Sequence, residues 1–173
     1  MEKERKKRKL DPQLMQRLYS GDEMTVLKAL GDLRSSGNLD YIPELLTLLQ
    51  RSETDNISKE IVTFLADIKQ KSVIHYFIEG LKNPELQNVH SEIASACWQS
   101  GMDYSPYIDL FIEIFLESDY MTSLESFSVI EQSLEFLSTA EILEKRALIL
   151  SGLQKVSTEK KPLARELINM MET

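Results

Sequence analysis

Three stretches of the sequence, YIPELLTLLQR (41–51), VIHYFIEGLKN (73–83) and YIDLFIEIFLE (107–117), align with one another without gaps. They begin 32 and 34 residues apart, and their apolar residues fall at the same positions, spaced i, i+3, i+4 and i+7. This spacing places the apolar side chains on one face of an α-helix. We therefore predict three equivalent amphipathic helices that bury the same face.

A second helix is predicted upstream of each of these three. Apolar residues recur with the same spacing in 26–33, 61–68 and 93–100, and these segments are offset by 35 and 32 residues. Each unit is therefore a helix, a short turn and a second helix. A repeat of this length is typical of arrays in which each helix pair buries its apolar face against its neighbours.

A fourth, more divergent pair and a closing helix near 160–172 are predicted after these units. The second helix of the fourth pair is expected to start at a capping box formed by Ser138 and Glu141. The residues expected to pack are Leu124, Phe127, Ile130 and Leu134 in its first helix, and Leu143, Ala147 and Leu150 in its second.

The ends of the helices carry recognisable capping signals. Ser20 and Glu23 have the spacing of a capping box, and Asn83 precedes a proline at a helix start. Gly37 and Gly101 stand where a left-handed residue would end the first helix of a pair. The aligned register also predicts the core, for which the expected residues are Leu30, Leu45, Leu49, Phe64, Leu65, Phe77, Ile78, Leu81, Phe111, Ile112 and Phe115.

The segment VLKALGDLRSSGNLDYIPELLTLL (26–49) resembles HEAT repeats, the two-helix members of the α-solenoids. The resemblance rests on the leucine-rich first helix, the aspartate near its end (Asp32, Asp67) and the Ile-Pro-Glu-Leu-Leu start of the second helix. It implies an all-α, right-handed α-solenoid of about four antiparallel helix pairs with a C-terminal capping helix. We expect residues 10–173 to form this HEAT-like helical repeat domain, preceded by a basic, flexible tail at 1–9.

Charge is distributed unevenly along the chain. Residues 1–9 contain six Lys or Arg and two Glu, whereas residues 83–144 contain twelve Asp or Glu and no Lys or Arg. Residues 145–173 are basic again, and the whole chain has a net charge of −8. An acidic stretch that cannot neutralise itself locally should present a negative field, which disfavours binding to nucleic acid phosphates.

The sequence carries no pattern typical of an enzyme. His75 and His90 lie on different predicted helices without partners at metal-ligand spacing, and Cys97 falls at a core position. No glycine-rich phosphate loop or nucleophile elbow is present. We therefore expect a protein without catalytic residues, metal or cofactor. The single cysteine, the charged N-terminus and the lack of a long apolar run favour a cytoplasmic protein that is not in the membrane.

A binding face is predicted on the second helices, which line the concave side of this class of solenoid. The residues expected to point outward there are Glu44, Tyr76, Glu79, Leu110, Glu113 and Glu117. Carboxylates interspersed with apolar side chains suit a basic, partly apolar segment of another protein. The sequence therefore predicts a non-catalytic protein–protein interaction or scaffold module, against the simpler alternative of a solvated helix face.

Two questions stay open: an alternative function, and what covers the helix at 107–117. The tail at 1–9 could bind RNA or DNA, and some HEAT-like proteins are DNA-acting enzymes, so a nucleic-acid-associated protein is the alternative function. The helix at 107–117 is polar only at Asp109, Glu113 and Glu117, so it should be covered on more than one side. We expect residues 119–173 to cover it. The alternative is a partner, for which a second copy of the chain is one candidate.

Overall fold

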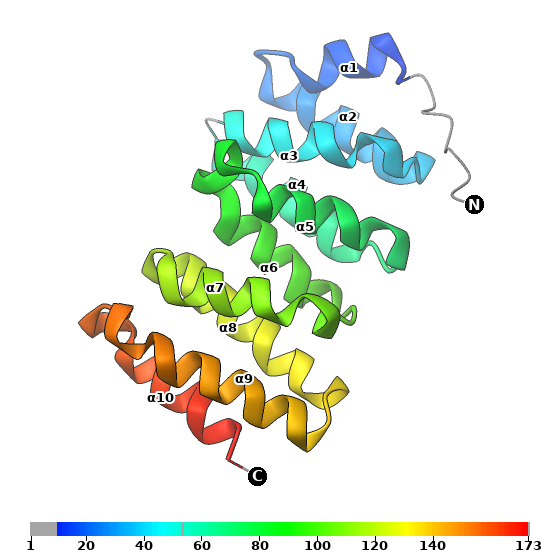
Figure 1. Cartoon of the computed structure of the whole chain (residues 1–173). Helices are drawn as coiled ribbons and strands as arrows, with labels where there is room; N and C mark the ends of the chain where they lie inside the picture. The colour runs from blue at the N-terminus through cyan, green and yellow to red at the C-terminus, as the bar shows by residue number, and fades with distance from the viewer. Residues whose placement is uncertain (1–9, 53, 173) are drawn as a thin grey trace. The chain divides into compact units, whose positions relative to one another are not determined.

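The structure, a computed structural model, describes residues 10–52 and 54–172 (Figure 1). Within these residues it contains ten α-helices, joined by loops and short 3₁₀ turns, and no strand, which confirms the all-α prediction. The predicted basic tail at 1–9 lies outside the described residues. The chain divides into two compact units, residues 1–65 and 66–173, and the boundary falls inside helix α4.

The first unit contains α1 (Pro12–Leu18), α2 (Glu23–Ser36), α3 (Ile42–Arg51) and most of α4 (Asp55–Asp67). The expected apolar faces of α2 and α3 are buried, as the repeat register predicts. Helix α1 was not predicted, although Asp11 caps it and a proline follows. It packs against α2, where Arg17 and Asp32 form an ion pair at 2.7 Å.

The predicted capping box at the start of α2 is wrong. The N-cap is Asp22, whose Oδ2 accepts a hydrogen bond from the backbone N–H of Thr25 at 3.0 Å. The hydroxyl of Ser20 instead accepts a hydrogen bond from the N–H of Asp22 at 3.1 Å. Glu23 is therefore the first helical residue, and Asp22 provides a charged acceptor closer to the free amides of the first turn.

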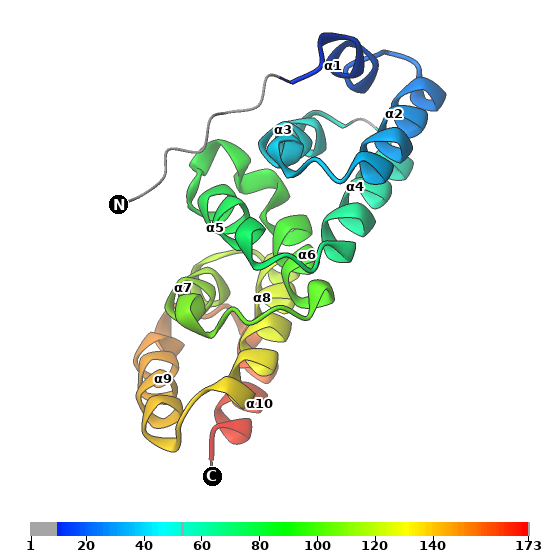
Figure 2. The ribbon, with the colours of Figure 1, turned by 90° about the vertical axis from the view of Figure 1, so that its right-hand side faces the viewer.

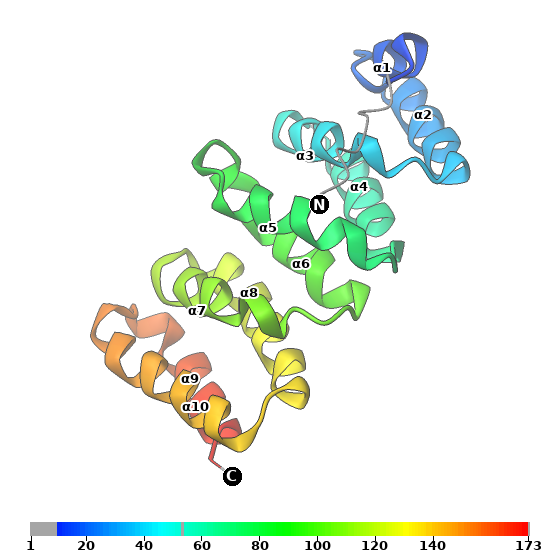
Figure 3. The same cartoon turned by 45° about the vertical axis from the view of Figure 1, so that its right-hand side comes forward.

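The second unit is built from six helices in two layers. Figure 2 shows α5, α7 and α9 on one side and α6, α8 and α10 on the other. Helix α8 packs against α6, α7 and α10. Helix α9 packs against α7 and α10, and Figure 3 shows α9 and α10 side by side. The bounds are Ile74–Lys82 for α5, His90–Ser100 for α6, Ile108–Glu117 for α7, Tyr120–Ser133 for α8, Thr139–Gly152 for α9 and Lys161–Met170 for α10.

Four of the predicted helix-end signals are confirmed. Gly37 and Gly101 end α2 and α6 in the left-handed conformation, with φ of 62° and 63°. Asn83 caps the 3₁₀ turn Pro84–Val89 by accepting from the N–H of Glu85 at 3.0 Å. The capping box of Ser138 and Glu141 starts α9.

Small residues on α8 allow the two layers to approach closely. Ser123, Ser126 and Ser133 are buried, and the hydroxyl of Ser123 donates a hydrogen bond to the carbonyl of Phe115 on α7 at 2.8 Å. At the end of α9, a Cβ placed on Gly152 would lie 2.5 Å from Leu116 Cδ1, so glycine permits the contact with α7. Helices α8 and α9 therefore cover part of α7, as predicted for the C-terminal residues.

All the residues predicted for the core from the aligned register are buried, but the predicted packing face of α9 is wrong. Leu143 and Leu150 are 50% and 41% exposed, and Ala147 is exposed as well. Ile142 and Ile149 are buried instead, at 9% and 0% exposure. Two neighbouring faces of this helix are apolar, one with the leucines and one with the isoleucines. The packing of α9 against α7 and α10 buries the face with the isoleucines.

A buried lysine closes the C-terminal end of α7. The ammonium of Lys160 donates hydrogen bonds to the carbonyls of Phe115, Leu116 and Ser118 at 3.1, 3.1 and 2.7 Å, and the residue is 3% exposed. These carbonyls lie at the negative end of the helix, where a cation is favoured. Burial lowers the pKa of Lys160, an effect partly offset by Asp119.

Candidate functional site

The structure places the six residues of the predicted binding face in both units. Glu44 lies on α3 in the first unit, and the other five lie on α5 and α7 in the second. Only these five can be described as one surface. They are exposed or half-buried, so the outward positions read from the aligned helices are correct for these helices.

Glu44 is engaged within the first unit. The hydroxyl of Tyr19 donates a hydrogen bond to Glu44 Oε2 at 2.9 Å, and the guanidinium of Arg51 lies 5.9 Å from the centre of the Tyr19 ring. Partial burial, followed by the bond to Glu44, raises the pKa of Tyr19 to about 12. The carboxylate of Glu44 therefore already accepts a hydrogen bond from Tyr19.

The two predicted residues on α5 differ in their surroundings. Tyr76 is half-buried and its ring lies 3.8 Å from that of His75, centroid to centroid. Glu79 is exposed and forms a long ion pair of 3.7 Å with Lys82, one turn further along the helix. Such an exposed pair contributes little to stability, which leaves Glu79 available to another cation.

The acidic row on α7 is partly neutralised by the C-terminal residues. Asp109 forms an ion pair with Lys145 at 2.9 Å, and Glu117 forms one with Lys155 at 3.2 Å. The hydrogen bond to Asp109 is the main reason why the pKa of Lys145 is raised. Glu113, between the two pairs, is exposed and makes no ion pair within the described part of the chain.

The expectation that the acidic segment lacks nearby counter-charges therefore needs correction. Residues 83–144 contain no cation, but the fold brings Lys145, Lys155 and Lys160 onto α7. The charge pattern of the sequence does not show these contacts, because the fold brings together charged residues that are far apart in the chain. Glu113 is the position on α7 where the predicted negative charge is left without a partner among the described residues.

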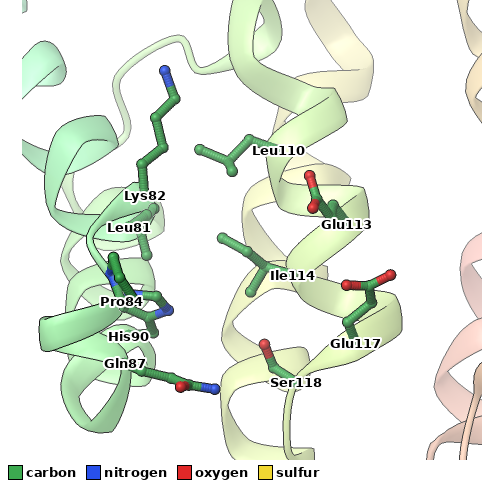
Figure 4. A pocket seen from close by; sticks show the side chains of 10 residues that line it. All are labelled: Leu81, Lys82, Pro84, Gln87, His90, Leu110, Glu113, Ile114, Glu117 and Ser118. Atoms are coloured by element: carbon green, nitrogen blue, oxygen red, sulfur yellow. The ribbon is translucent and has the colours of Figure 1, made fainter.

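A groove of about 560 Å³ separates α7 from α5 and the following 3₁₀ turn (Figure 4). Leu110 and Ile114 point from α7 toward Leu81 on the opposite wall, and Glu113 and Glu117 lie beside them. The groove is lined by Leu81, Lys82, Pro84, Gln87, His90, Leu110, Glu113, Ile114, Glu117 and Ser118.

The groove contains three of the predicted residues: Leu110, Glu113 and Glu117. Tyr76 and Glu79 lie outside it. The sequence analysis did not predict Ile114 as a residue that lines a groove, although almost the whole surface of α7 around it is apolar. The sequence analysis also did not predict that the turn Pro84–Val89 forms one wall of the groove. The Asn-Pro pair that starts this turn was the only feature of the sequence that pointed to it.

A smaller groove of about 300 Å³ lies at the other end of the same two helices. Its walls come from the start of α5 and from the 3₁₀ turn Ser105–Tyr107 before α7, and they include His75, Asp103 and Tyr107. The Nδ1 atom of His75 lies 2.7 Å from the carbonyl of Ser72, so this imidazole is already hydrogen-bonded locally.

Groups suited to metal binding do not come together in the described residues. No group of three or more His, Cys, Asp or Glu side chains there could hold a metal ion. Cys97 is fully buried, and burial raises the pKa of its thiol to about 12, which disfavours the nucleophilic thiolate. Among the same residues, no helix is long and apolar enough to cross a membrane.

No family model matches the chain, and no curated protein matches its sequence. The fold class and the geometry of the α5–α7 surface therefore provide the basis for a functional proposal.

Proposed function

We propose that the protein is a non-catalytic protein–protein interaction module that binds a basic segment of another protein through an acidic face on its second helices. We further propose that its helices form a right-handed, HEAT-like α-solenoid of about four antiparallel pairs, α2 with α3 through α8 with α9, closed by α10. The recurring apolar register and the two helix layers of the second unit support this arrangement.

The observation that carries the functional proposal is the state of Glu113. It is exposed, makes no ion pair among the described residues, and stands beside the half-buried Leu110 at the edge of a groove. A carboxylate in this position can attract a cation without first losing a partner. The neighbouring apolar side chains can then be covered by the bound segment.

Charge and apolar contacts are expected to contribute differently to binding. The exposed carboxylates Glu79 and Glu113 should mainly increase the association rate and orient the partner, because surface charges are screened by salt. Leu110 should slow dissociation, because a desolvated apolar side chain contributes binding energy that salt does not screen. Binding should therefore weaken as ionic strength rises, chiefly through a slower association.

A double charge reversal tests the proposal. Glu79→Lys with Glu113→Lys should leave the helical content unchanged by circular dichroism, because both residues are exposed. It should slow association with protein partners captured from the native cell severalfold or more, measured by surface plasmon resonance. The matched control is Glu131→Lys, an exposed residue of α8 in the other helix layer, which should bind at the wild-type rate. Unchanged association of every partner with the double variant would contradict the proposal.

The alternative is a nucleic-acid-associated protein, and the observation that favours it is the basic composition of residues 1–9. Removing these nine residues distinguishes the two functions. If the protein acts through its tail, the shortened chain loses RNA or DNA binding while partners of the acidic face are retained. Tight, salt-sensitive binding of duplex DNA by the shortened chain would instead favour a HEAT-like DNA-acting protein.

A further inference from the structure

The groove between α5 and α7 has an apolar floor. Leu81 and Ile114 are 3% and 7% exposed, so they form the buried base of the groove, which the packed core holds in place. Leu110 is half-buried and reaches into the space between the two helices (Figure 4). The volume of about 560 Å³ lies within the range of about 300–1,000 Å³ that is typical of ligand sites in proteins.

The rim of the groove is acidic along α7. Glu113 and Glu117 are four residues apart on one helix, so their carboxylates project at points separated by about 6 Å along the helix axis. Glu113 makes no ion pair in the described region, and the ion pair of Glu117 joins two exposed side chains. Exposed pairs of this kind are weak. A cation from a partner can therefore reach Glu113 directly and can replace Lys155 at Glu117.

We propose that this groove receives an apolar side chain of a partner peptide whose neighbouring lysine or arginine residues bind Glu113 and Glu117. The inference rests on the proposed function and specifies its chemistry: the partner segment is basic and also carries an aliphatic or aromatic anchor. A polybasic segment without an anchor would leave the accessible part of Leu110 uncovered.

The geometry favours a cationic ligand over an anionic one. Lys82 is the one lysine or arginine among the lining residues, and it lies within 3.7 Å of Glu79. The opposite wall presents two carboxylates. Arginine suits this site because its planar guanidinium can bind a carboxylate while it also lies against apolar side chains.

A library of random peptides displayed on phage, selected on the full chain, provides a direct test. We expect the selected peptides to combine an aliphatic or aromatic residue with flanking Lys or Arg. A synthetic peptide of that consensus should lose tenfold or more in affinity when its apolar anchor is replaced by alanine. Glu113→Gln should weaken the same peptide severalfold, whereas the control Glu131→Gln on α8 should not.

The methyl groups of the groove provide a readout that needs no substitution. In the wild-type protein, titration with the peptide should shift the NMR signals of the Leu110 and Ile114 methyl groups and leave those of Leu143 and Leu150 on α9 unchanged. Leu110→Ala, a change at a half-buried residue, should reduce affinity while the circular dichroism spectrum is retained.

The outcomes separate this inference from the proposed function. Basic peptides whose binding depends on Glu113, but neither on their apolar anchor nor on Leu110, would overturn the groove and retain the acidic face. Selection of acidic peptides, of peptides without Lys or Arg, or of none would overturn both.

Discussion

Replacing Lys160 with methionine tests whether its ammonium holds the end of α7. The substitution keeps most of the aliphatic stem and removes the donor to the carbonyls of Phe115, Leu116 and Ser118. Ser123 still donates to the Phe115 carbonyl at 2.8 Å, so the partly buried carbonyls of Leu116 and Ser118 are the two that lose their lysine donor. At about 1–3 kcal/mol for each unsatisfied buried group, the gross cost is about 2–6 kcal/mol. Part of this cost is offset because the variant no longer buries a charge. We therefore expect the free energy of unfolding to fall by about 2–4 kcal/mol.

The assay is urea denaturation followed by the fluorescence of Trp98, the sole tryptophan. Its indole N–H donates to Glu125 on α8, so it reports on the unit that contains Lys160. Lys161→Met is the matched control, because the adjacent lysine is exposed, and it should change stability by less than about 0.5 kcal/mol.

The pH dependence of this substitution has a definite sign. Because burial lowers the pKa of Lys160 in the folded state, the unfolded chain binds more protons between that pKa and the ordinary value of 10.5. The free energy of unfolding of the wild type therefore rises with pH across that window. The variant has no ionisable group at this position, so the difference in stability between the wild type and Lys160→Met should rise as well. A cost that falls with pH, or a stability equal to that of the Lys161→Met control, would refute the reasoning.

Four further substitutions have expected outcomes in the same assay or in thermal melts. Phe111→Ala should cost about 3–5 kcal/mol, because the ring is fully buried, and a neutral result would mean that the packing of α7 is described wrongly. On α9, Ile149→Ala should cost about 2–5 kcal/mol while Leu143→Ser stays within about 0.5 kcal/mol, and the reverse order would restore the register predicted from the sequence. Because the pKa of Tyr19 is raised from 10.0 to about 12, its stabilising effect is complete below pH 10 and is lost as the pH rises toward 12. The stability gap between the wild type and Tyr19→Phe should narrow over that range, and a gap that does not change with pH would contradict the raised pKa of Tyr19, to which burial and then the bond to Glu44 contribute.

The sequence was most informative where apolar and polar arcs alternate cleanly. In α3 and α5 a single arc is apolar, so the spacing could indicate which side chains are buried, and Leu45 and Phe77 are buried as predicted. In α9 both arcs are apolar, and the spacing of Leu143 and Leu150 is as regular as that of Ile142 and Ile149. Only the positions of α7 and α10 decide between them, and those positions are not encoded in the local pattern.

The candidate site was predictable in part for a related reason. Helical periodicity placed Leu110, Glu113 and Glu117 outward on α7, which the structure confirms. The groove beside them depends on how far α7 lies from α5 and from the turn that begins at Pro84, a distance that no repeat alignment contains. The ion pairs of Lys145 and Lys155 likewise join residues that the charge pattern treats as separate blocks.

The buried lysine also limits how the chain can be divided. In a simple repeat array each pair contacts only its neighbours, so a terminal pair can be removed with a graded loss of stability. Here Lys160 reaches back 45 positions to the carbonyl of Phe115. A chain that ends after α9 would therefore retain α8 and α9, which pack against α7, but lose the lysine that closes the end of α7. The segment that follows α9 therefore stabilises the end of a helix that lies well before it in the sequence, and a change in the length of that segment would move Lys160 away from α7.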